Sequence, residues 1–124
     1  MVKTTLSTHE VAGMLADLVS SGHFEGAQNT LFAENVISID LPDANGNAAQ
    51  TKGLPAIIER THQFQAAVAS VERLKVSPPI VQGNAIALEF ELDFTLKTGG
   101  QQQLAELIVY LVKDGKIIHE QFFA

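Results

Sequence analysis

Residues 84–96 read NAIALEFELDFTL, and an apolar side chain occupies every second position of this stretch. The positions between them are small or polar and include Glu89, Glu91 and Asp93. This alternation is typical of an antiparallel strand with one buried face and one solvated face. We therefore interpret the three carboxylates as a solvated row or the edge of an interface.

The same period of two continues on both sides of this strand. Residues 71–78 precede it and end at Pro78-Pro79, while residues 102–113 and 117–123 follow it. The dipeptide Asp114-Gly115 separates the last two stretches and favours a tight hairpin turn. The second half of the chain thus predicts four antiparallel strands.

The first half of the chain has helical spacing instead. Ser7 and Glu10 stand three residues apart, as in a capping box, and Gly22 is a natural end for the helix that follows. Apolar residues then recur at helical spacing in two further segments. We expect these three helices to run from Ser7 to about Ser21, from Phe24 to Phe32, and from Gly53 to about Ser70.

Residues 36–40 form a short β-branched stretch between the second and third helices and predict one more strand. Residues 41–52 follow it with turn chemistry and form either a long loop or a loose hairpin. Segregated helices and strands indicate an α+β fold, with three N-terminal helices packed on a mainly antiparallel sheet. A chain of 124 residues predicts a single domain spanning 1–124.

Composition excludes several classes of function. The net charge is −6, and the eight basic residues are spread from Lys3 to Lys116, so we expect neither nucleic-acid binding nor binding to acidic membranes. No cysteine is present, which excludes thiolate nucleophiles and disulfides. The longest apolar run, Leu104 to Val112, contains Glu106 and is too short to cross a bilayer. Without a signal-peptide pattern at the N-terminus, we expect a soluble cytoplasmic protein.

Four short motifs occur in an order that resembles the SnoaL-like, ketosteroid-isomerase-like superfamily. They are the helix junction SGHFEG at 21–26, the strand entry LFAENV at 31–36, the helix start GLPAI at 53–57, and the hairpin DGKI at 114–117. The resemblance covers essentially the whole chain. It implies a cystatin-like α+β cone, in which a curved sheet wraps around the helices and encloses a pocket, and a homodimer formed through the sheet.

Asp40 is the foremost candidate for chemistry. It ends the first predicted strand, where the resemblance places the general base of ketosteroid isomerases. An aspartate at the mouth of an apolar pocket would have a raised pKa, which suits proton abstraction next to a carbonyl. The alternative is that Asp40 begins the turn at 40–43 and caps a backbone amide.

The resemblance argues against steroid isomerisation itself. Those enzymes place a tyrosine on the first helix and a protonated aspartate on a late strand. The matching positions here are Met14-Leu15-Ala16 and Glu106-Leu107-Ile108, which contain neither residue. Without donors for the enolate oxygen, a base loses the largest electrostatic contribution to catalysis.

Three further side chains are candidates. Glu106 and Tyr110 share strand parity, so both line the pocket if that face points inward; otherwise Glu106 faces solvent or a dimer interface. His119 and Glu120 must face opposite sides of the last strand, and only one of them enters the pocket. A histidine in the pocket would act as a base or donor near neutral pH, whereas the alternative is a partly exposed strand histidine.

We therefore expect an apolar pocket that binds a small apolar or weakly polar organic molecule. As an enzyme, the protein would be a cofactor-free isomerase, cyclase or hydrolase that uses acid–base chemistry. Asp40 would be the base, with His119, Glu106 and Tyr110 as partners, and with no metal. The alternative is a non-catalytic ligand-binding or accessory dimeric domain.

Overall fold

The computed structural model describes residues 5–124 and contains three helices and a seven-stranded sheet. The elements follow in the order α1 (Thr8–Ser20), α2 (Phe24–Leu31), β1 (Phe32–Pro42), β2 (Ala48–Lys52), α3 (Leu54–Ala67), β3 (Val68–Val76), β4 (Ile80–Gln82), β5 (Ala85–Leu96), β6 (Gln101–Lys113) and β7 (Lys116–Phe123). The predicted three helices and the predicted strands are all present. The α+β fold class is confirmed.

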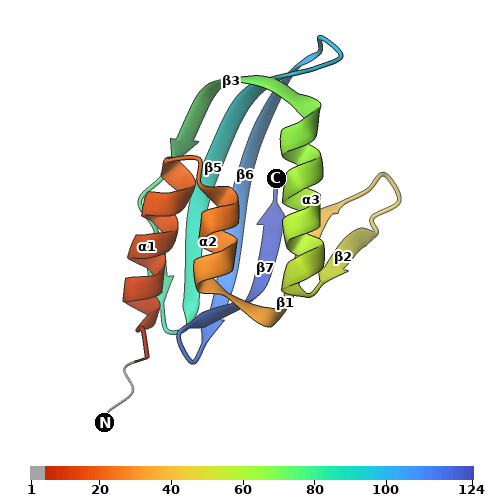
Figure 1. Cartoon of the computed structure of the whole chain (residues 1–124). Helices are drawn as coiled ribbons and strands as arrows, with labels where there is room; N and C mark the ends of the chain where they lie inside the picture. Colours follow the sequence, from red (N-terminus) through yellow and green to blue (C-terminus); the bar gives the residue numbers. More distant parts are fainter. Residues whose placement is uncertain (1–4) are drawn as a thin grey trace.

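The strands form one sheet in the order β2-β1-β7-β6-β5-β3, and β4 pairs with β5. All neighbours are antiparallel except β1 and β7, which run parallel. The three helices lie on one face of this sheet (Figure 1). We call that side the helix-covered face and the other side the open face.

The segment 41–52 forms a hairpin with the end of β1 and not a long loop. Strands β1 and β2 pair from Ile37–Lys52 to Pro42–Ala48. Asp43 closes the turn, because its Oδ1 accepts hydrogen bonds from the backbone amides of Asn45 at 2.8 Å and Asn47 at 3.0 Å. Strand β1 is longer than residues 36–40, since it also pairs with β7 on its other side.

Local chemistry explains where helix α1 and the last hairpin begin and end. Ser7 and Glu10 form the predicted capping box, with bonds of 2.9 and 3.1 Å. Gly22 ends α1 with a φ of 79°, which favours glycine. The turn between β6 and β7 needs positive φ at both central positions, and Asp114-Gly115 adopts 53° and 75°.

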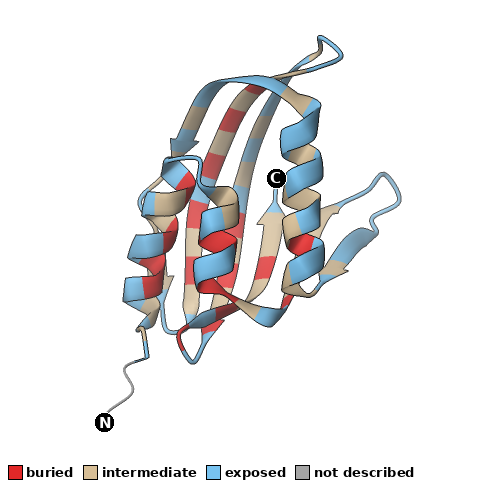
Figure 2. Cartoon of the chain, in the orientation of Figure 1, coloured by how far each residue is buried: buried red, intermediate tan, exposed pale blue. Residues whose placement is uncertain are grey.

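The core lies between the helices and the helix-covered face of the sheet (Figure 2). Helix α1 contributes Val11 and Leu15, and strand β5 contributes Ile86, Leu88 and Leu92, all at most 1% exposed. The carboxylates of β5 point to the open face, as their alternation with these residues requires. There, Arg73 Nη1 lies 3.3 Å from Glu91 Oε1. In the described part of the chain, no helix combines the length and the apolar character needed to cross a membrane.

Candidate functional site

A cavity of about 200 Å³ lies between the helices and the sheet. All three helices and strands β1, β5, β6 and β7 contribute to its wall. Six of the lining residues are aromatic: Phe24, Phe32, Phe64, Phe90, Tyr110 and Phe122. Only Gln28, Arg60, Thr61, Tyr110 and Glu120 bring polar side-chain atoms to this wall within residues 5–124. The cavity is therefore an apolar, aromatic chamber with a few polar points, as ligand pockets usually are.

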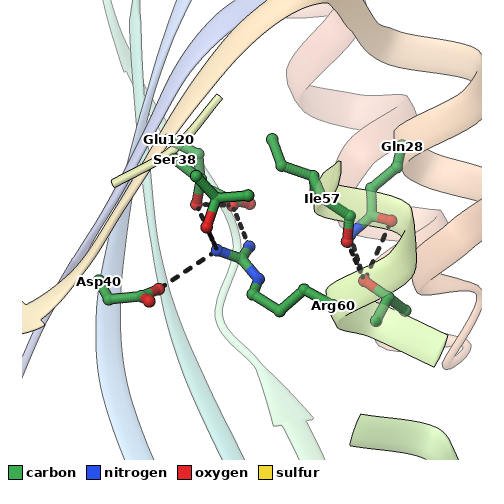
Figure 3. A network of polar contacts seen from close by, with 8 residues as sticks. Gln28, Ser38, Asp40, Ile57, Arg60 and Glu120 are labelled. Atoms are coloured by element: carbon green, nitrogen blue, oxygen red, sulfur yellow. Dashed lines mark hydrogen bonds and ion pairs between the residues drawn. The ribbon is translucent and has the colours of Figure 1, made fainter. Parts of the chain in front are cut away.

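Glu120 is the buried acid of this chamber, with a residue exposure of 5%. Ser38, which is fully buried on the neighbouring strand β1, donates a hydrogen bond from Oγ to Glu120 Oε1 at 2.7 Å. Arg60 Nη2 donates to the same oxygen at 3.3 Å (Figure 3). Burial raises the pKa of Glu120, while the Ser38 hydrogen bond and the Arg60 charge oppose that rise. Such a balance suits a group that both accepts and releases a proton.

Arg60 joins helix α3 to the sheet on the other side of the chamber. Its Nη1 lies 3.1 Å from Ser38 Oγ, 3.2 Å from Asp40 Oδ1 and 3.4 Å from Thr51 Oγ1. The guanidinium also lies over the Phe122 ring, 5.8 Å from its centroid. One cation therefore bridges two carboxylates, Asp40 and Glu120, of which only Glu120 is buried.

A β-bulge explains why Glu120, and not His119, lines the cavity. Ile117 pairs with Val112 and is buried in the core, but the next pair joins His119 to Leu111. Strand β7 therefore contains one extra residue at this point, so the alternation of faces restarts after Ile118. His119 faces away from the cavity and its Nε2 lies 3.2 Å from Gln121 Oε1. Simple parity from the core residue Ile117 would have placed His119 inside.

Asp40 and Glu106 stand together at the mouth of the chamber. Both line a second, more open hollow of about 320 Å³ that shares Arg60 and Phe122 with the cavity wall. The Asp40 side chain is 41% exposed and is paired with Arg60. Burial raises the pKa of Glu106, and the nearby charge of Asp40 adds to that rise. The predicted base position therefore borders the entrance, and its carboxylate is held by an arginine.

Tyr110 lies directly beside Glu120 in the sheet, because the two residues are paired across β6 and β7. It is 2% exposed and lines the cavity. Burial raises its pKa far above the ordinary value, and the charges of Glu120 and Glu106 add to that rise. The phenol therefore keeps its proton and is available as a hydrogen-bond donor.

Of the four candidate site residues, Tyr110 lines the cavity, Asp40 and Glu106 line the adjoining hollow at its mouth, and His119 lines neither. The sequence pattern did not indicate Ser38 or Arg60. It predicted that either His119 or Glu120 enters the pocket, and His119 was the candidate for chemistry. A signal for Arg60 was present, because it stands three residues after Ile57 and four before Phe64 on the apolar side of α3. Within residues 5–124, no three His, Asp or Glu side chains are grouped closely enough to hold a metal ion.

The family model of the SnoaL-like domain matches residues 6–124. A crystal structure of a presumed SnoaL-like polyketide cyclase from Mesorhizobium loti is similar, with 29% identity, a TM-score of 0.86, and coverage of 96% of this chain and 100% of that one.

More distant structures share the fold. A protein of ketosteroid isomerase-like fold from Catenulispora acidiphila, crystallised with trimethylamine, has 17% identity, a TM-score of 0.71, and coverage of 95% and 87% of the two chains. A presumed polyketide cyclase from Pseudomonas putida has 14% identity, a TM-score of 0.68, and coverage of 96% and 92%. No relative was found among curated proteins. With a family model that spans nearly its whole length, the chain belongs to the SnoaL-like domain family.

Proposed function

We propose that the protein binds a small, largely apolar organic molecule in its cavity and acts on it by cofactor-free acid–base chemistry, as an isomerase, cyclase or hydrolase. The observation that carries this proposal is Glu120, a buried carboxyl group in a largely apolar chamber. Burying a carboxylate costs free energy, and here Ser38 and Arg60 offset that cost only in part. A purely structural core position would be filled more stably by an apolar side chain.

The arrangement of atoms supports a specific role for Glu120. Among the described residues, its hydrogen bonds and ion pair all use Oε1, which leaves Oε2 for a ligand. In the proposed step, Oε2 takes a proton from the carbon next to a ligand carbonyl. The C–H electron pair moves toward the carbonyl oxygen, and Tyr110 donates a hydrogen bond to the negative charge that develops there. Return of the proton to carbon completes the cycle without an external oxidant or reductant.

In this proposal, Asp40 and Glu106 line the entrance to the cavity. Asp40 keeps the role of alternative base that the family resemblance gives it, and Arg60 links it to Glu120. Glu106 lines the same entrance. The position of His119 on the open face gives it no contact with a ligand in the cavity.

Hydrogen–deuterium exchange tests the chemistry without knowledge of the natural substrate. We expect the protein to accelerate exchange of the protons next to the carbonyl of acetophenone or phenylacetone in deuterated buffer, followed by NMR. Glu120→Gln keeps the size of the side chain and removes its basicity. It should slow the catalysed exchange by about 10²-fold or more, because that is the usual contribution of a positioned base.

Two other variants make the result decisive. Glu89→Gln changes an exposed glutamate of β5 and should leave exchange unchanged. Asp40→Asn separates the two candidate bases. If it abolishes exchange while Glu120→Gln does not, Asp40 is the base and the role given to Glu120 is wrong. Binding of the ketones without any exchange would favour the alternative, a non-catalytic ligand-binding domain.

A further inference from the structure

The cavity has a second polar point, on the helices and separate from Glu120. Gln28 of α2 is 8% exposed and lines the cavity next to Thr61 of α3. Gln28 Nε2 donates to Thr61 Oγ1 at 2.9 Å, and Gln28 Oε1 lies 3.1 Å from the same hydroxyl. The Thr61 hydroxyl also lies 3.2 Å from the backbone carbonyl of Ile57.

These contacts leave the amide of Gln28 with unused hydrogen-bonding capacity. A glutamine amide has two N–H donors and two lone pairs, whereas the threonine hydroxyl has a single proton. That proton serves either Gln28 Oε1 or the Ile57 carbonyl, and not both. Among the described residues, Thr61 is the one hydrogen-bond partner of the Gln28 side chain. At least one donor and one lone pair of a nearly buried amide therefore stay open beside the cavity, and leaving such groups unmatched is costly.

The size and charge of the chamber limit what can fill it. A dry cavity of about 150 Å³ holds one benzene molecule, so the 200 Å³ chamber matches one substituted ring rather than several fused ones. A negative ligand would meet Glu120, Asp40 and Glu106 around the polar end, and the one cation there, Arg60, is already paired with Asp40 and Glu120. The aromatic wall between the two polar points favours a flat, uncharged body.

We infer that the ligand is an uncharged single-ring compound with two oxygen functions, one bound beside Glu120 and Tyr110 on the sheet and the other bound by the Gln28 amide on the helices. This inference rests on the proposed function and adds Gln28 as a residue that determines specificity. A ligand with only one oxygen would leave the Gln28 amide facing an apolar surface. The site should therefore prefer the ligand with two oxygens.

Two matched pairs of ketones test this inference. The probes are 4-hydroxyacetophenone against 4-methylacetophenone, and the 3-substituted pair, titrated by calorimetry and by protein NMR. Within each pair a hydroxyl replaces a methyl group of nearly the same size. For the wild-type protein we expect at least one hydroxy compound to bind about 5- to 10-fold more tightly than its methyl partner, since a buried hydrogen bond usually has this effect.

The variant Gln28→Met keeps an unbranched side chain of similar length and removes the amide. It should abolish or reverse the preference for the hydroxy compound. The control Gln63→Met makes the same change at an exposed position of α3 and should keep the preference. If Gln28→Met does not fold, Thr61→Val frees the amide from its partner and should also alter the preference.

The outcomes separate this inference from the proposed function. Equal binding of both members in both pairs, or an unchanged preference in Gln28→Met, overturns the role of Gln28 and leaves the cavity as a ligand site. Failure of all four ketones to bind the wild-type protein overturns both the proposed function and this inference.

Discussion

At the scale of single residues, the protonation of Glu120 connects the site to the stability of the fold. Burial raises its pKa above the ordinary 4.5. The folded protein therefore holds a proton on Glu120 at pH values where the unfolded chain has released it. The stability that this proton supplies is fully present below the unfolded pKa and is lost as the pH rises through the folded pKa. The pKa of Glu106 is raised as well.

We predict that Glu120→Gln changes the pH dependence of stability. Glutamine resembles the protonated acid and cannot ionise, so the variant escapes the loss that the wild-type protein suffers at higher pH. Its free energy of unfolding, relative to wild type, should therefore increase between about pH 4 and about pH 8. Urea denaturation at a series of pH values measures this difference. A constant difference across the series would show that burial does not raise the pKa of Glu120.

The exposed acids with lowered pKa values have the opposite effect on the pH dependence of stability. Hydrogen bonds from Ser7 lower the pKa of Glu10, and those from Thr95 and Ser70 lower the pKa of Glu72. The stability that these two ionised acids contribute is lost as the pH falls through their folded-state pKa values. The control variant Glu89→Gln leaves all of these groups in place, so it should follow the wild-type curve.

At the scale of elements, helix α1 shows how a local signal supports a distant site. Its capping box satisfies backbone groups at the helix start, and its inner face carries Leu15 and Val19 into the cavity wall. The cap at Ser7 therefore stabilises a helix that forms one side of the chamber.

We predict that Ser7→Ala destabilises the protein by about 1 kcal/mol, because an N-cap hydroxyl usually contributes that much. Ser20→Ala, at the other end of the same helix, removes only a side-chain bond to the Asp17 carbonyl and should have a smaller effect. Chemical denaturation of both variants gives the comparison. A loss at position 20 equal to that at position 7 would argue against the capping box as the cause.

Most elements were predictable from the sequence because their signals are local. The alternation in residues 84–96, the Ser7–Glu10 spacing and the Asp114-Gly115 turn each depend on a few neighbouring side chains. Helix α3 and strand β3 meet at Val68, about three residues before the expected change of period, because the backbone of Val68 pairs with Leu96. The spacing of apolar residues around Val68 does not indicate a pairing partner that lies nearly thirty positions away.

The site was less predictable for the same reason. Strand parity puts Glu106 and Tyr110 on the same face of β6, since no irregularity separates them in the pairing of β6 with β5. A bulge decides whether His119 or Glu120 faces the cavity. The bulge arises from the pairing of β7 with β6, and the residues of β7 alone do not indicate it. Arg60 has an apolar neighbourhood along the helix, and its four polar partners lie on β1, β2 and β7.

At the scale of the whole molecule, the open face of the sheet carries exposed apolar side chains at its centre. Leu107 of β6 and Phe123 of β7 are paired across the two strands and are 41% and 42% exposed. Together with the family resemblance, this patch supports a homodimer that forms through the open face, which we propose as the assembly in solution.

We predict that Leu107→Glu, alone or with Phe123→Glu, converts a wild-type dimer to a monomer, because a buried unpaired carboxylate disfavours the interface. Light scattering coupled to size-exclusion chromatography measures the mass. Met14→Glu changes an exposed apolar residue of α1, on the helix-covered side of the sheet, and should leave the dimer intact. A wild-type protein that is monomeric at about 100 μM, a concentration well above the affinity range of stable interfaces, would remove the proposal.

The parallel pairing of β1 with β7 has a consequence for the order in which the protein is made. Ser38 and Glu120, which meet across that pair, are separated by 82 positions. On the ribosome, α3 and its Arg60 are complete long before β7 emerges, and β1 waits with one edge unpaired. The acid of the site is therefore made after all three helices and after strands β1 to β6. Until translation has released β7, the nascent chain contains the chamber's helices and the other strands of its sheet but lacks the buried carboxyl group of Glu120.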